Sequence, residues 1–163
     1  MSVEFEVRLG IRTVPKAQLF RDLSAAVRSA ILVDSVPSWE ADLDSDDVIG
    51  SGDDTFRLEL GPDAVIQCRC YTVGPEDAFG EDGGWWVCFS VVLRTPESFL
   101  LMIFASACLG QVAGTQVLDD SGFFGRGRWL KPADLLAVVA TSGRLPFADA
   151  ARLVCASLGV SFG

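Results

Sequence analysis

The residues in this sequence that most clearly suggest a chemical role are carboxylates spaced two apart. Asp42, Asp44 and Asp46, with Asp53 further on, match positions 1, 3, 5 and 12 of a calcium-binding loop. Position 6, however, is Asp47 where the sharp turn needs glycine, and position 12 is aspartate rather than a bidentate glutamate. We therefore expect no bound metal, and interpret this run as either a solvated acidic loop or an acidic recognition loop.

A second pair of carboxylates, Asp119 and Asp120, precedes Ser121 and Gly122. Two carboxylates at a strand end can share acid and base roles in catalysis. Asp-Asp-Ser-Gly is also typical of a turn whose side chains bond their own backbone, and we favour this second interpretation. Because the chain has no histidine, Ser–His and Cys–His nucleophiles and histidine-ligated metals are excluded. We expect a protein that is not an enzyme and needs no cofactor, with a histidine-free enzyme using Asp119 and Asp120 as a second alternative.

The cysteines indicate a reducing compartment. Their number is odd and all of them lie in apolar patterns, where free cysteine behaves as a small hydrophobic residue: Cys68, Cys70, Cys88, Cys108 and Cys155. Cys68 and Cys70 would point to the same side of a strand, but no second ligand pair exists to complete a metal site. No apolar stretch reaches the ~18 residues needed to span a membrane. We expect a cytoplasmic protein.

The net charge of −9 is concentrated in one part of the chain. Residues 35–82 contain 13 acids and 2 bases, a net charge of −11, which leaves +2 for the rest. This excess of negative charge disfavours nucleic acid and anionic membranes and favours a basic protein as partner. The candidate partner-binding residues are the acids and isolated aromatics of the two acidic loops: Trp39, Asp42, Asp44, Asp46, Asp47, Asp53, Asp54, Phe79, Glu81 and Asp82.

The apolar periodicity predicts the elements that must hold these loops. Residues 3–11 alternate apolar and polar, as in a strand whose five apolar side chains share one face. A helical stripe from about Pro15 to Ile31 follows, which we expect to cover that strand. Residues 56–60 and 66–70 alternate around the turn Gly61-Pro62-Asp63, which predicts a hairpin. The second acidic loop, residues 74–84, then leads into the apolar run 85–93, expected to be a central strand covered on both faces.

The remainder of the chain adds helices. Thr95 and Pro96 begin an apolar helix that we expect to end at Gly110, followed by a short strand at 116–118 and an ordered loop at 122–129. Proline at the start and glycine at the end predict two further helices over 132–143 and 146–159. The expected fold is a single α+β domain over residues 1–163, a mainly antiparallel sheet with helices packed on it, in the order β-α-β-β-β-α-β-α-α.

The segment from Trp85 to Asp120 resembles part of the small bacterial immunity proteins that neutralise polymorphic toxins. The shared pattern is an apolar strand, a helix begun by proline and ended by Leu-Gly, and a short strand that ends in Val-Leu-Asp-Asp-Ser-Gly. The resemblance implies a cytosolic inhibitor that binds the active cleft of a toxin. It assigns no functional residue.

The leading hypothesis is a cytoplasmic protein-binding module, an immunity or antitoxin-like inhibitor whose acidic loops meet a basic toxin or effector domain. Charge of this kind accelerates association and enforces specificity, while a few buried aromatic anchors supply affinity. Trp39 and Phe79 are the expected anchors. The alternative is a structural or adaptor subunit of a bacterial assembly that uses the Phe99 helix or the C-terminal helices.

Overall fold

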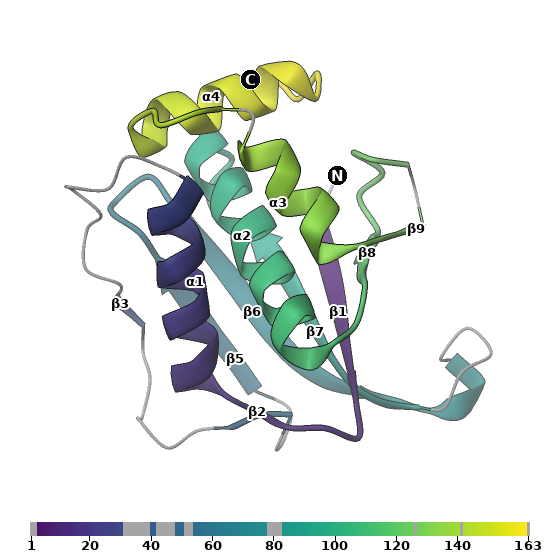
Figure 1. Ribbon diagram of the computed structural model, residues 1–163. Coiled ribbons are helices and arrows are strands. Elements are labelled where there is room, and N and C mark those ends of the chain that lie inside the picture. Colours follow the sequence, from purple (N-terminus) through teal and green to yellow (C-terminus); the bar gives the residue numbers. More distant parts are fainter. Residues whose placement is uncertain are drawn as a thin grey trace.

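The computed structural model describes residues 3–30, 40–41, 48–50, 54–77, 83–125, 127–140 and 142–162. Within these ranges the chain has the predicted α+β fold, with helices packed on one face of an antiparallel sheet (Figure 1). The strands are β1 (Glu4–Gly10), β2 (Val14–Pro15), β3 (Glu40–Ala41), β4 (Val48–Ile49), β5 (Asp54–Glu59), β6 (Val65–Val73), β7 (Gly84–Val91), β8 (Val117–Asp119) and β9 (Arg128–Leu130). The helices are α1 (Lys16–Ala30), the short 3-10 helix η1 (Pro75–Asp77), α2 (Pro96–Ala113), α3 (Pro132–Ala140) and α4 (Phe147–Ser157).

The main sheet has seven strands in the order β3-β5-β6-β7-β1-β8-β9, and β2 pairs with β4 in a small second sheet. The predicted hairpin is confirmed as β5–β6, and β6 and β7 form the next antiparallel pair. β7 lies fourth of seven, as the prediction of a central strand requires. The N-terminal strand β1 lies between β7 and β8, so segments far apart in the sequence meet at the middle of the sheet.

The alternation predicted for residues 3–11 holds only as far as Leu9. Phe5, Val7 and Leu9 are buried, but Ile11 is 92% exposed, so the expected fifth apolar contact is wrong. The pairing of β1 with β7 shifts register between Arg8 and Gly10, and Gly10 has φ 62°. This left-handed turn, which glycine adopts without strain, directs the chain away from the core before Ile11.

Helix α2 begins as the sequence predicts and ends later. The Thr95 hydroxyl accepts a hydrogen bond from the Ser98 amide at 3.1 Å, and Pro96 takes the first turn. The helix continues through Gly110 and ends at Gly114, whose φ is 67°, so the predicted end at Gly110 is wrong. Gly110 serves packing instead, because a Cβ there would lie 2.9 Å from Cγ of Pro132.

The side chains of α2 are buried around nearly its whole circumference. One side packs on β1, β6, β7 and β8, and the others pack on α1, α3 and α4. The expectation that the helix after Pro15 covers β1 is therefore wrong, because α2 occupies that position and α1 lies beside it. By length and composition α2 is apolar enough to cross a membrane, but 78% of it is buried inside this fold.

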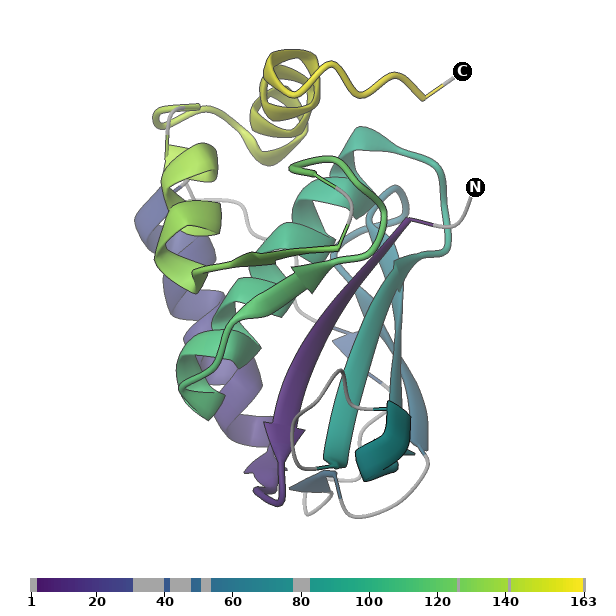
Figure 2. The same ribbon diagram turned by 90° about the vertical axis from the view of Figure 1, so that its right-hand side faces the viewer.

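Helices α1, α2 and α3 lie on one side of the sheet, and α4 lies across the end of α2 and α3 (Figure 2). Among the described residues no α-helix covers the opposite face, yet every residue of β7 is buried or partly buried. The outward-facing Trp86 is nevertheless 2% exposed, because it packs against Trp129 at 6.0 Å between ring centroids and beneath the Arg8 guanidinium at 5.9 Å. A local cluster of side chains thus explains the apolar sequence of this strand.

The segment predicted as an ordered loop at 122–129 also supplies the first residues of β9. Phe123 packs edge-on against Phe99 at 4.8 Å, and Phe124 lies 6.2 Å from the ring of Phe5. Arg128 donates to the Phe124 carbonyl at 3.3 Å. Two aromatic side chains therefore close the edge of the core, while β9 extends the sheet beyond β8.

Replacing Phe104, which is fully buried in α2, should test the central role of this helix. Phe104→Ala should lower the free energy of unfolding by about 3 to 5 kcal/mol, because it removes a large side chain from a site with no room to collapse. Urea denaturation measures this loss. Leu153→Ala, at a side chain 46% exposed on α4, is the control and should change stability by less than about 0.5 kcal/mol. A loss below about 1 kcal/mol for Phe104→Ala would contradict the packing described for α2.

Candidate functional site

The acidic and aromatic residues predicted to bind a partner lie almost wholly outside the described residues. These are Trp39, Asp42, Asp44, Asp46, Asp47, Asp53, Phe79, Glu81 and Asp82. Asp54 is described through its backbone, which begins β5 opposite Cys70. The structure therefore gives the positions of the segments that adjoin these residues in the chain.

Most of these attachment points gather at one end of the sheet, beside the turn Gly10–Ile11: Val48–Gly50, Pro75–Asp77 and Gly83–Gly84 (Figure 2). We call these segments, together with the turn, the loop end. Gly10 pairs with Trp85, and Val73, just before η1, pairs with Gly84. A Cβ on Gly84 would lie 2.4 Å from the Gly10 carbonyl oxygen, so this close approach of β1 and β7 requires glycine. The ends of both acidic loops are thus held on neighbouring strands.

Among the described residues of the loop end, Ile11 is the most exposed large apolar side chain. The turn that carries it is closed by a hydrogen bond from the Arg12 amide to the Leu9 carbonyl at 3.1 Å. The Arg12 guanidinium donates to the Ala113 carbonyl at 3.2 Å, which ties the turn to the C-terminal end of α2. Beside Ile11 lies an open hollow of about 380 Å³, lined by residues that include Val73, Pro75 and Trp85. Sequence reasoning missed Ile11 because alternation placed it in the core.

The uncovered sheet face carries three rows of outward side chains, set by the strand register. The row at Cys88 runs Thr55, Arg69, Cys88, Glu6 and Leu118. The row at Ser90 runs Arg57, Gln67, Ser90 and Glu4, and the row at Trp86 runs Tyr71, Trp86 and Arg8. In two rows, therefore, a cation lies on the β5–β6 side and an acid lies opposite it on β1, while Glu59, the next outward residue of β5, lies 3.7 Å from Arg57.

Tyr71 and Glu6 form the main polar contact on this face. The Tyr71 hydroxyl donates to Oε1 of Glu6 at 2.6 Å, and the Arg69 guanidinium lies 5.7 Å from the Tyr71 ring. Burial raises the pKa of Glu6, the Tyr71 hydrogen bond lowers it, and the nearby acids Asp120 and Glu4 raise it further; the net direction is upward. Burial and the Glu6 carboxylate both raise the pKa of Tyr71. Both shifts therefore make the two groups harder to ionise than they are in water.

Asp119 and Asp120 do not form a paired carboxylate site. Asp119 is fully buried, and its two carboxylate oxygens accept hydrogen bonds from the amides of Gly122 at 2.8 Å and Phe124 at 2.6 Å. This is the turn-capping role that the sequence favoured. Asp120 is exposed.

The cysteine side chains offer no activated thiol. Cys68, Cys70, Cys108 and Cys155 are buried, Cys88 is partly exposed, and none of them forms a disulfide. Burial raises the pKa values of the Cys88, Cys108 and Cys155 thiols to about 12. In the part of the chain that the structure describes, no group of three or more acidic or cysteine side chains could hold a metal ion.

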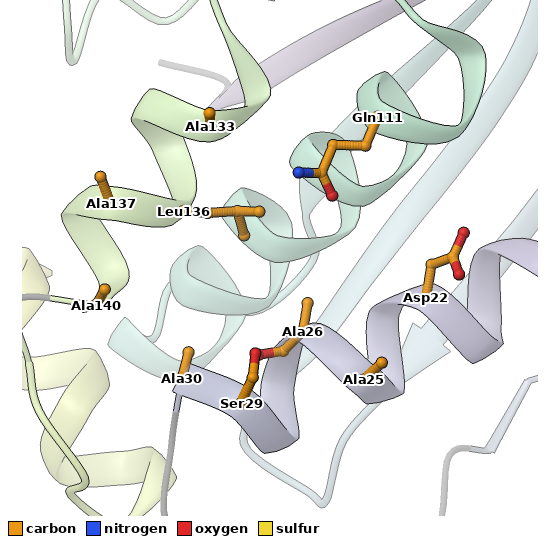
Figure 3. A pocket seen from close by; sticks show the side chains of 10 residues that line it. All are labelled: Asp22, Ala25, Ala26, Ser29, Ala30, Gln111, Ala133, Leu136, Ala137 and Ala140. Carbon is orange, nitrogen blue, oxygen red and sulfur yellow. The ribbon is translucent and has the colours of Figure 1, made fainter.

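A groove on the helical side lies between α1 and α3 (Figure 3). Its volume is about 670 Å³, and alanines of both helices line it because they leave space that larger side chains would fill. Asp22 is its only charged lining residue, and the Asp22 carboxylate accepts hydrogen bonds from Gln18 at 3.0 Å. The groove presents no nucleophile or ion pair.

Comparisons of the chain with protein-family models, curated proteins and solved structures found no match.

Glu6→Gln should increase stability at neutral pH. Because the folded-state pKa of Glu6 lies above its ordinary value, protonation of Glu6 stabilises the fold below the ordinary pKa, and this contribution is lost as pH rises through the folded-state pKa. Glutamine stays neutral, so its advantage over the wild type should be present at pH ~7 and vanish near pH ~4. Thermal unfolding at several pH values measures the difference. An advantage that is absent at neutral pH, or that persists in acid, would contradict this account.

The Tyr71–Glu6 contact has its own spectroscopic signal, because Tyr71 is the single tyrosine of the chain. Its phenol should ionise above the usual value of about 10 in an ultraviolet titration, and Glu6→Gln should lower that pKa by removing the adjacent charge. Glu97→Gln, on α2, is the matched control and should leave the titration unchanged. An ordinary tyrosine pKa in the folded wild type would show that the hydrogen bond is not formed.

Proposed function

We propose that this protein is a cytoplasmic protein-binding module, an inhibitor of the immunity or antitoxin kind, and that its loop end binds a basic toxin or effector domain. In this proposal the protein acts by occupying the partner's surface rather than by catalysis. The partner is a protein, and neither nucleic acid nor a membrane is involved.

The gathering of the acidic-loop attachment points around Ile11 is the observation that supports this proposal most. Residues 35–82 have a net charge of −11, and their described ends at Val48–Gly50, Pro75–Asp77 and Gly83 lie beside an apolar side chain that is 92% exposed. An exposed anchor next to a charged border is the usual composition of a protein-binding surface. The acidic residues would attract a basic partner, and the Ile11 side chain would fill an apolar pocket on the surface of that partner.

The rigidity of the loop end favours binding. Ile11 lies on a turn held by the Arg12 amide and by the guanidinium contact to α2. A side chain already held in position loses less conformational entropy on binding than one on a free loop. The alternative role, assembly through the Phe99 helix, has less support because Phe99 and its neighbours on α2 are buried.

The genomic neighbourhood distinguishes the two functions. A toxin gene directly beside this gene would support the inhibitor, and its product would then be the partner for binding measurements. A secretion or assembly operon would instead support an adaptor subunit.

Neutralising Asp44, Asp46, Asp47, Asp53 and Asp54 to asparagine and serine should slow association with the basic partner. Exposed charges act over about 8 Å at physiological salt, so they mainly steer encounter. Surface-binding kinetics at two salt concentrations should show the wild type slowing toward the variant as salt rises. Neutralising Asp63 and Asp149, exposed acids remote from the loop end, is the control. Equal association rates for wild type and variant at low salt would contradict the proposal.

Ile11→Ser should raise the dissociation rate without affecting the fold. The side chain is almost fully exposed, so its removal should change stability by less than about 0.5 kcal/mol, whereas loss of a binding anchor costs about 2 kcal/mol or more of affinity. Trp39→Ala and Phe79→Ala should act in the same way if they fill pockets on the partner. Leu153→Ser, on the exposed side of α4, is the control. Unchanged dissociation for Ile11→Ser would exclude the loop end as the contact.

A further inference from the structure

The uncovered sheet face has a charge arrangement that is complementary to itself. On the β5–β6 side the exposed cations are Arg57 and Arg69, of which Arg57 lies 3.7 Å from the Glu59 carboxylate on the same strand. Beyond β7 the acids are Glu4 and Glu6 of β1 and Asp120 after β8. Asp120 follows Asp119, which pairs with Phe5, so Asp120 lies level with Glu4. β7, with Cys88 and Ser90 facing outward, separates the two sides.

From this arrangement we propose that the protein forms a homodimer in which two uncovered sheet faces pack together about a two-fold axis parallel to β7. Such a rotation leaves β7 facing β7 of the second copy and exchanges the two sides, so that β6 faces β1 and β5 faces β8. Each side of one copy then meets the opposite side of the other, as an isologous contact requires.

The strand register identifies the residues that would meet. In the row at Cys88, Arg69 faces Glu6 of the second copy, and Cys88 faces its own equivalent. In the row at Ser90, Arg57 faces the position of Asp120.

The row at Trp86 is complementary in another way. There Tyr71 faces Arg8 of the second copy, which places a cation over an aromatic ring. All three rows are therefore favourable with the same axis. An axis perpendicular to the strands through the row at Cys88 would instead place Arg69 opposite Arg69 and Glu6 opposite Glu6.

The area of the face is sufficient for such a contact. Five neighbouring strands at ~4.8 Å spacing and seven residues at ~3.3 Å rise give roughly 550 Å² of flat area per copy. Two copies together would bury about 1,000 Å² or more, the lower range of specific interfaces. Since much of the face is polar, we expect a weak dimer that dissociates at high salt.

Sedimentation velocity over a range of protein concentrations tests the dimer. The sedimenting mass of the wild type should rise from that of the 17.5 kDa monomer toward twice that mass as concentration increases. Arg69→Glu should weaken the dimer about tenfold or more, because it places a glutamate opposite Glu6 at each of the two symmetric contacts. Arg57→Glu and Asp120→Arg should each weaken it, and the double reversal should restore it to within about threefold of the wild type. These two side chains are exposed, so the variants should fold, and circular dichroism verifies this. Arg144→Glu, an exposed site on the helical side, should leave the dimer unchanged.

Cross-linking through Cys88 tests the proposed position of the two-fold axis. It is the one cysteine of the five that is not buried, so a bismaleimide that spans the ~10 Å between packed sheets should link two copies through it. Because burial raises the pKa of this thiol to about 12, the reaction needs mildly alkaline buffer and long exposure. Cys88→Ser should abolish the link.

A protein that stays monomeric at the highest concentration would overturn the proposal. A dimer that is insensitive to the three charge reversals and gives no Cys88 link would also overturn it, since another face would then hold the two copies together.

Discussion

The burial of α2 on every side is the constraint on which the rest of this structure depends. A helix whose apolar residues cover its whole circumference must have a neighbour in each direction, and here the sheet supplies one side while α1, α3 and α4 supply the others. Its ends are held as firmly as its flanks. At the N-terminal end the Ser98 hydroxyl accepts from the Val65 amide at 2.9 Å, and at the C-terminal end Arg12 binds the Ala113 carbonyl. The four helices therefore gather on one side of the sheet, and no helix in the described part of the chain covers the opposite face.

The sequence predicts the larger elements of this fold because their periodicities are local. The alternation in β1, the turn between β5 and β6, and the proline and glycine signals of the helices each depend on a few adjacent residues. The predictions that proved wrong concern features that depend on residues distant in the sequence. Nothing near Ile11 reveals that the register of β1 shifts against β7, and nothing near Gly110 reveals that Pro132 will require a residue without a side chain there.

The same limit applies to the short strands. β2 and β4 have two residues each, too few to show alternation, and β9 has three. Each exists because a partner strand offers backbone groups to pair with, and a partner is not visible in a local pattern. The uniform apolarity of α2 had a related effect: it predicted full burial correctly but could not specify which element lies on which side, so α1 was placed over β1.

The candidate binding surfaces were predictable in composition and not in position. The excess of acids between residues 35 and 82 is plain in the sequence, whereas the convergence of their flanking segments on Ile11 depends on the pairings Gly10–Trp85 and Val73–Gly84. The rows on the uncovered face likewise need the register of five strands before Arg69 and Glu6 can be seen on either side of Cys88. Charge counts therefore indicate a kind of partner, while strand pairing determines where a partner could sit.

The position of β1 has a consequence for how the chain folds during synthesis. Strand β1 is an interior strand of the finished sheet, and both of its neighbours are synthesised much later than β1 itself: Glu4 pairs with Ser90, and Phe5 pairs with Asp119. Contacts between residues so far apart in sequence form slowly, because a long loop must close before they stabilise the chain. Until residue 119 has emerged, the apolar side of β1 lacks its neighbours and is open to association with other nascent chains. The hairpin β5–β6 and helix α2 can form earlier, so the chain is expected to fold from its middle outward, with its N-terminal strand among the last parts to be enclosed.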